Sequence, residues 1–184
     1  MRYQHDKEDE YDLTAMIAKP LYFGMFVNVM IPAVLVFICY YINNRYYQDN
    51  YVPELANPLF YVLCAVALGQ AALALWWRNK SFSKPMVRRA ESFEHDVATE
   101  IHRRSKPVFM VIAAISLWGV LYFALTGRFV EQVVFVVFSF VVFQVVRPRY
   151  GSLRRLIDFQ QELVDNEQFM GGYLGEIRKD IEGE

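Results

Sequence analysis

The sequence predicts an all-α integral membrane protein whose four transmembrane helices form two hairpins, each followed by an amphipathic cytoplasmic helix. Composition is the first reason, since apolar residues make up 55% of the chain and charged residues only 21%. The second reason is that the charged residues are missing from long stretches of the chain. The third is that the basic residues gather on one side of these stretches.

Four stretches contain no Asp, Glu, Lys or Arg, namely residues 21–42, 58–77, 107–127 and 132–146. A helix rises about 1.5 Å per residue, so about 20 residues cross a hydrocarbon core that is about 30 Å thick. The first three stretches reach that length, and the fourth does so when it is extended back to Arg128. We therefore expect four membrane spans.

The basic residues predict the orientation, because short cytoplasmic segments next to spans retain Lys and Arg. Eight lie between the second and third stretches and six follow the fourth, whereas the two remaining loops carry one each, Arg45 and Arg128. Both termini are therefore expected in the cytoplasm, in a multi-pass protein of the inner membrane. Five acidic residues among the first eighteen argue against a cleaved signal peptide or a mitochondrial transit peptide.

The same pattern divides the chain into four parts. These are an N-terminal cytoplasmic segment (1–19), a first hairpin with its helix (20–104), a second hairpin with its helix (105–170) and a C-terminal tail (171–184). Val87-Arg88-Arg89 and Leu153-Arg154-Arg155 match at an offset of 66 residues, and a Lys-Pro pair precedes the first and third spans. Either the halves are an internal repeat, or any basic amphipathic helix after a hairpin gives this likeness.

The cytoplasmic helices are predicted from apolar residues at three- and four-residue steps, which gather on one helix face. The second is expected to end at Gly171-Gly172. These faces could pair with each other, lie on the bilayer or bind a partner. An anionic bilayer surface would repel clustered acids such as Glu91 and Glu94, so pairing of the two helices is favoured. The residues expected to face a partner are Phe93, Val97, Leu156 and Leu163.

Polar and small side chains inside the spans predict where the helices pack. Amide side chains in lipid form hydrogen bonds between helices, worth about 1 kcal/mol each, and small residues at four-residue spacing let backbones approach. Pro32 should kink the first span, where an amide can satisfy a freed backbone group. The alternative for the amides is that they line a permeation path. The expected packing residues are Asn28, Ala65, Gly69, Gln70, Ala72 and Gln144.

Residue types that carry chemistry are scarce in this sequence. Arg128 and Glu131 are expected to form a hydrated pair at the membrane interface rather than a proton-carrying site. Cys39 and Cys64, the only cysteines, both lie in apolar stretches and cannot build a disulfide framework or a zinc site. The three histidines lie outside the spans, which argues against haem held by intramembrane histidines. We expect no catalytic residue, no metal site and no cofactor.

The first hairpin loosely resembles the small hairpin subunits of type IV secretion machines. The resemblance covers Lys19 to about Arg89 and rests on Lys19, Pro20, Phe23, Gly24 and Asn28. The second hairpin has no counterpart in those subunits. What the resemblance implies is a place in a secretion or transport apparatus.

Together these observations favour a non-enzymatic accessory or scaffold subunit of a bacterial inner-membrane complex. Its expected partners are the lipid bilayer and other membrane subunits, or further copies of itself as a homo-oligomer, and no nucleic acid. The alternative is a small oligomeric channel or pore-forming membrane effector, with Gln70 or Gln144 along its path.

Overall fold

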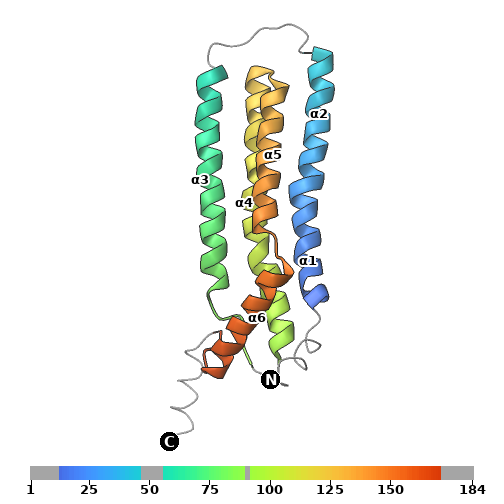
Figure 1. Cartoon of the computed structure of the whole chain (residues 1–184). Helices are drawn as coiled ribbons and strands as arrows, with labels where there is room; N and C mark the ends of the chain where they lie inside the picture. The colour runs from blue at the N-terminus through green and yellow to red at the C-terminus, as the bar shows by residue number, and fades with distance from the viewer. Residues whose placement is uncertain (1–12, 47–55, 90–91, 171–184) are drawn as a thin grey trace, which may run out of the picture. The chain divides into compact units, whose positions relative to one another are not determined.

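The computed structural model of the chain describes residues 13–46, 56–89 and 92–170. In order, its elements are α1 (Leu13–Met25), a π-helical turn (Phe26–Met30), α2 (Ile31–Tyr46), α3 (Ala56–Phe82), α4 (Phe93–Thr126), α5 (Phe129–Val146) and α6 (Tyr150–Asp165) (Figure 1). These described residues contain no strand. Most of the tyrosine-rich loop between the first two spans, and the expected tail from residue 171, lie outside them.

Four of the helical segments are long and apolar enough to cross a membrane, as the sequence predicts. They are Met16–Tyr46, Ala56–Phe82, Phe93–Thr126 and Phe129–Val146. The prediction of an all-helical, multi-pass membrane protein is confirmed at this level.

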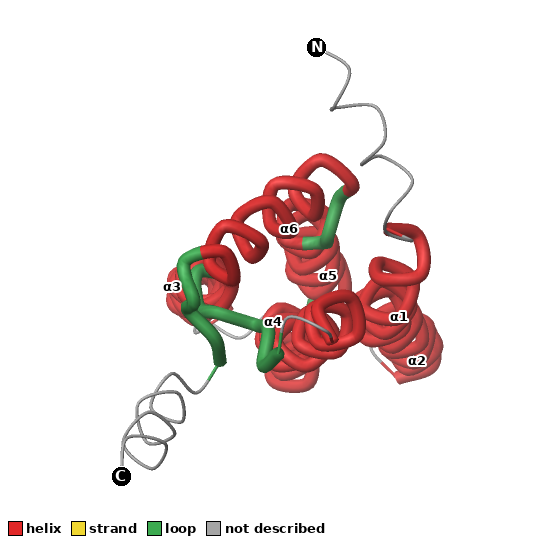
Figure 2. Tube along the Cα trace, turned by 90° about the horizontal axis from the view of Figure 1, so that it is seen from below, coloured by secondary structure: helices red, strands yellow, loops and turns green. Residues whose placement is uncertain are grey.

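The chain divides into two compact units, which we describe separately. The span unit comprises residues 21–79 and 105–147, and the polar unit comprises residues 1–20, 80–104 and 148–184. Within the span unit, α2, α3 and α5 run along the apolar part of α4 (Figure 1). Within the polar unit, the loop after α3 lies beside the C-terminal end of α6 (Figure 2).

Aromatic side chains and alanines build the core of the span unit. The ring of Phe109 on α4 meets that of Phe143 on α5 edge-on, with 5.5 Å between centroids. Phe60 on α3 does the same with Tyr122 at 5.6 Å and with Phe135 at 5.7 Å. Edge-to-face pairs at these distances are the favoured geometry for aromatic rings. On α3 the small side chains Ala67, Ala71 and Ala74 are buried in the same core.

The π-helical turn stands directly before Pro32, which has no N–H to donate to the preceding turn. The N–H of Ile31 donates to the carbonyl of Phe26, a bond that spans five residues. A turn widened in this way changes which carbonyls are satisfied by the helix itself. The Asn28 side chain lies in this turn, and its Nδ2 donates to the carbonyl of Gly24 at 3.1 Å. The amide therefore serves its own helix here.

The helix expected after the second span is not separate from the third span. Residues 84–89 lie outside any helix, and α4 then runs without a break from Phe93 through Pro107 to Thr126. A proline inside a helix removes one hydrogen-bond donor and disturbs one turn, and α4 tolerates this disturbance at Pro107. Consequently Val87-Arg88-Arg89 lies in a loop, whereas its proposed counterpart, residues 153–155, lies within α6.

Gly127 makes the short connection between α4 and α5 possible. Its φ of 70° lies in the left-handed region, which glycine adopts without steric cost. Its N–H donates to the carbonyl of Phe123 at 2.8 Å, closing the last turn of α4. Only Gly127 and Arg128 separate the two helices.

The helix expected to continue to Gly171 ends earlier, at Asp165. Asn166 stops it, because its Nδ2 donates to the carbonyl of Glu162 at 2.8 Å. Glu167 then adopts a φ of 58°, which turns the backbone away from the helix axis. An asparagine at the end of a helix competes for the last free carbonyls in this way.

Candidate functional site

The expected packing face of α3 points outward in this chain. Ala65, Gly69 and Ala72 are exposed, and a Cβ built on Gly69 would meet no atom within 4 Å. Small residues occupy two neighbouring faces of α3, and the face with Ala67 and Ala71 is the one buried. Packing through Ala65, Gly69 and Ala72 is therefore not made inside this chain.

Gln70 joins α3 to α4 through both groups of its amide. Its Nε2 donates to the carbonyl of Val111 at 2.6 Å, and its Oε1 accepts the indole N–H of Trp118 at 2.8 Å. Such a bridge is how an amide becomes tolerable in lipid. Gln144, on α5, is half-buried.

Gln132 is a buried amide that the sequence interpretation did not single out. Its side chain is fully buried beside the Cys39 thiol of α2, which is a weak donor, and no other described residue offers its Nε2 or Oε1 a hydrogen bond. The hydroxyl of Tyr122 is in the same situation. Gly119 on α4 lies against Gln132, since a Cβ there would stand 2.8 Å from the Gln132 carbonyl oxygen. Polar atoms without partners are costly inside a membrane protein.

Arg128 and Glu131, expected to pair, are in direct contact. The Arg128 Nη1 lies 3.1 Å from the Glu131 Oε1, and both side chains are more than a quarter exposed. The same nitrogen donates to the Oδ1 of Asn57 at 3.0 Å. Arg128 therefore ties the start of α3 to the start of α5.

The four residues expected to face a partner have different surroundings. Phe93 and Val97 are buried within the chain, with 8% and 0% of their surface exposed. Leu156 and Leu163 on α6 are half-buried. A partner role for Phe93 and Val97 would require them to leave the positions they occupy here, so a partner surface must use other side chains.

The most specifically built part of the polar unit is the loop that follows α3. We call Ser83–Arg89 the braced loop, because side chains from two other helices bind its backbone. Arg104 of α4 donates through Nη1 to the carbonyls of Ser81 and Lys84, and through Nη2 to that of Pro85 at 2.7 Å. The Ser81 bond satisfies one of the carbonyls that the end of α3 leaves without a helical partner.

The charge of Arg104 is itself fixed by a carboxylate. Its Nε donates to Glu100 Oε2 at 3.0 Å, one helical turn earlier on α4. The Glu100 side chain is only 5% exposed, and Arg103 also contacts it at 3.1 Å. A buried guanidinium and carboxylate at this spacing hold each other in one geometry, so the fork of Arg104 is aimed at the loop.

Gln160 of α6 and Asp96 of α4 complete the brace. Gln160 is 1% exposed, its Oε1 accepts the N–H of Met86 at 2.8 Å, and its Nε2 donates to the carbonyl of Lys84 at 3.2 Å. Asp96 accepts the N–H of Arg88 at 2.9 Å. Beyond α6, the N–H of Met170 donates to the carbonyl of Val87 at 2.7 Å. The backbone of the braced loop is therefore bound by α4, by α6 and by the segment that follows α6.

The apolar side chains of the braced loop are buried and its basic side chains are exposed. Met86 and Val87 are 0% and 1% exposed, whereas Lys84, Arg88 and Arg89 are exposed. The loop thus inserts two apolar residues and presents three cations on a backbone of fixed conformation. The described residues bring together no group of three or more His, Cys, Asp or Glu side chains that could hold a metal ion.

Two signals for the brace were present in the sequence. Glu100 and Arg104 stand four residues apart, the spacing of a helical ion pair. Gln160 follows Leu153 and Ile157 at four- and three-residue steps, so it is a polar residue in an apolar stripe. A buried amide in such a position needs a partner, and backbone is the commonest one.

Comparison of the chain with protein-family models, with curated proteins and with solved structures finds no match.

Proposed function

We propose that this chain is a non-enzymatic accessory or scaffold subunit of a bacterial inner-membrane complex, and that it holds a partner with an acidic surface at the braced loop. The observation that carries the proposal is the binding of the loop backbone by Arg104, Gln160 and Asp96. A connection between two spans does not require such a fixed conformation.

A fixed loop suits docking because binding then costs little conformational entropy. Lys84, Arg88 and Arg89 are exposed, and their backbone positions are determined before any partner arrives. Arginine side chains form paired, planar hydrogen bonds with carboxylates, which favours an acidic partner. Partner and loop would thus meet as two preformed surfaces.

The proposal includes the expected topology, with two hairpins and both termini in the cytoplasm. It is supported by the composition of the polar unit, which combines the start of α1, the segment between α3 and α4, and the segment after α5. An even number of spans places these three segments on one side, and they hold most of the basic residues.

A channel is the alternative, and the contacts that the structure describes for Gln70 do not favour it. The amide of Gln70 is occupied by Val111 and Trp118, so lining a path would cost it both bonds. An ion-flux measurement with purified protein in liposomes separates the two functions. The scaffold predicts no flux above that of empty liposomes, whereas flux that changes in Gln70→Leu would favour the channel.

The test of the scaffold uses the two neighbouring glutamines of α6. Gln160→Ala removes two bonds to the loop, whereas the matched control Gln161→Ala changes a half-buried neighbour. Each full-length variant is purified from its native membrane in mild detergent, and retained proteins are identified by mass spectrometry. We expect a specific partner with the wild-type chain and with Gln161→Ala, and its loss with Gln160→Ala.

Two results would contradict the scaffold. One is a partner that stays bound to Gln160→Ala as firmly as to the wild-type chain, which would show that the braced loop is not its docking site. The other is a wild-type chain that retains no protein at all. Helical content measured by circular dichroism shows in each case that the spans are intact.

Orientation can be tested separately by labelling single cysteines from outside the cell, in a chain that lacks Cys39 and Cys64. A cysteine at Asn50 should react and one at Ser83 should not, because the loop after α3 is placed in the cytoplasm. The reverse pattern would place the braced loop on the outer side and exclude a cytoplasmic partner.

A further inference from the structure

The polar unit contains a cavity of about 620 Å³, none of whose lining residues belongs to the braced loop. Its lining comes from the start of α1 and from the first three turns of α4, together with Ser92 just before α4. This volume is within the range of about 300–1,000 Å³ that is usual for small-molecule sites. The lining residues are Met16, Lys19, Ser92, Glu94, His95, Ala98, Thr99 and His102.

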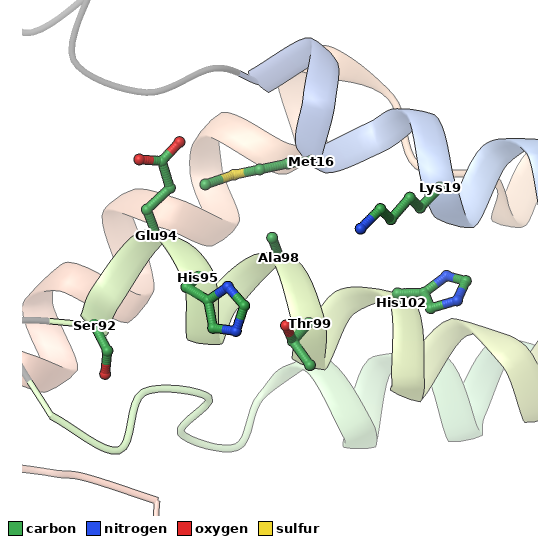
Figure 3. A pocket seen from close by; sticks show the side chains of 8 residues that line it. All are labelled: Met16, Lys19, Ser92, Glu94, His95, Ala98, Thr99 and His102. Carbon is green, nitrogen blue, oxygen red and sulfur yellow. The ribbon is translucent and has the colours of Figure 1, made fainter.

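Groups that can bind an anion converge on this cavity. Lys19 extends from α1 into the space between α1 and α4, on the side where α4 carries the small residue Ala98 (Figure 3). His95, Thr99 and His102 follow one another along α4 at four- and three-residue steps, which places them on one side of the helix. An ammonium, two imidazoles and a hydroxyl are groups that can donate hydrogen bonds to an oxyanion.

The opposing carboxylate stands at the far end of the cavity. Glu94 precedes His102 by eight residues, a distance of about 12 Å along a helix axis. An anion held between Lys19 and His102 is therefore separated from Glu94 by most of the cavity. The cavity is polarised, with its positive end toward the apolar part of α4.

A metal ion does not fit this arrangement as well. His95 and His102 are seven residues apart, about 10.5 Å along the axis, whereas both bonds to one zinc ion measure only about 2 Å. The ammonium of Lys19 stands in the same cavity and would repel a cation. An oxyanion is the ligand that its charge favours.

The position of Lys19 relative to the membrane indicates which oxyanion could reach the cavity. Lys19 directly precedes Pro20 and the uncharged stretch that begins at Leu21. A lysine at the end of a span lies at the level of the lipid headgroups, where its ammonium contacts phosphate. His102 lies five residues before Pro107, the first residue of the third uncharged stretch. The positive end of the cavity is thus placed at headgroup depth.

We propose that this cavity is a binding site for a phosphate group, held by Lys19, His102 and Thr99 and supplied by a phospholipid headgroup or by free phosphate. The site does not depend on the scaffold function, because it shares no residue with the braced loop. A bound phosphate would join α1 to α4, the two helices that line the cavity.

The test uses the full-length chain in neutral detergent and two probes. In one arm, micelles contain phosphatidic acid, whose headgroup is a bare phosphate, and native mass spectrometry measures the bound lipid. In the other arm, inorganic phosphate is titrated and followed by calorimetry. Lys19→Gln and Thr99→Val change the cavity. Lys80→Gln removes the same charge from an exposed lysine of the polar unit that lies outside both the cavity lining and the braced loop.

We expect Lys19→Gln to weaken binding of phosphatidic acid about tenfold or more, since a bond to a charged group is worth about 1.5–3 kcal/mol and 1.4 kcal/mol is tenfold. Thr99→Val should weaken it several-fold, and Lys80→Gln less than twofold. Binding of inorganic phosphate with the same order of effects would make free phosphate a sufficient ligand, and binding of the lipid alone would identify a headgroup site. Equal losses in Lys19→Gln and Lys80→Gln, or no binding of either probe, would overturn the proposal.

Discussion

The span unit and the braced loop of the polar unit are held by different interactions. In the span unit the helices bond their own backbone, and contacts between helices are mainly apolar, such as the Phe109 and Phe143 rings. Side-chain bonds between helices are few there, like that of Ser139 Oγ to the carbonyl of Ile112 at 2.9 Å. In the braced loop, by contrast, polar side chains bind the backbone: Arg104 and Gln160 donate to its carbonyls, and Gln160 and Asp96 accept its N–H groups.

The difference follows from what the backbone requires in each region. A helix satisfies its own N–H and carbonyl groups, which is why helices can cross lipid and need only shape to pack. A loop with Met86 and Val87 buried has backbone groups that water reaches poorly, and each of them needs a partner. Polar side chains are therefore expected to be decisive in the loop and mostly dispensable in the spans.

The largest expected effect is that of Arg104→Ala. The change removes the bonds to three carbonyls and leaves the Glu100 carboxylate, 5% exposed, with the exposed Arg103 as its remaining ion-pair partner among the described residues. Loss of one member of a buried ion pair costs about 3–5 kcal/mol. Chemical unfolding in detergent measures it, with Arg103→Ala as the control. Arg103 is 60% exposed and should cost less than about 1 kcal/mol. Equal costs would show that the brace is not stabilising.

Next in size is a steric change in the span unit. In Gly119→Ala the new Cβ would lie 2.8 Å from the carbonyl oxygen of Gln132 and 2.9 Å from Cβ of Phe135, so α4 and α5 must separate. Overpacking of this kind costs about 1–3 kcal/mol. In Gly69→Ala the Cβ meets nothing, and thermal stability in detergent should stay the same or rise slightly. If Gly69→Ala were instead the more destabilising variant, the face of α3 that carries Gly69 would be the one that packs.

Two glutamines of the span unit, the half-buried Gln70 and the buried Gln132, give a smaller contrast of opposite sign. Gln70→Leu loses two bonds and leaves the Trp118 N–H without its acceptor, which should cost about 1–2 kcal/mol. Gln132→Leu replaces an amide to which the described residues offer no partner stronger than the Cys39 thiol, and should stabilise the span unit by about 1 kcal/mol. Both are measured by unfolding in detergent. Destabilisation by Gln132→Leu would show that this amide makes a stabilising bond, with Cys39 or with a group outside the chain.

Much of the span unit could be predicted from the sequence, because a membrane span can be recognised from consecutive residues without charge. Each of the four uncharged stretches coincides with one of the four helical segments, and only the third extends past its helix, by the single residue Gly127. Which face of α3 is buried could not be predicted, because one face carries Ala65 and Gly69 and its neighbour carries Ala67 and Ala71. Only the neighbouring helices decide between two faces of similar composition.

The polar unit was harder to predict, for a related reason. Met86, Ala90, Phe93 and Val97 follow one another at three- and four-residue steps, which favours a helix that begins at Met86. Residues 84–89 instead form a loop, whose backbone is bound by Arg104 and Gln160. These contacts join residues up to 76 positions apart, and no local pattern records them. Phe93 and Val97 were therefore assigned to a partner, although the chain buries them itself.

Amide hydrogen exchange in the braced loop tests the central claim most directly, namely that side chains fix this loop before any partner binds. The N–H groups of Met86 and Arg88 donate to Gln160 and Asp96. In the full-length chain in detergent we predict that both exchange slowly, that Gln160→Ala exposes the Met86 amide, and that Gln161→Ala leaves it protected. Rapid exchange at Met86 and Arg88 in the wild-type chain would contradict the account.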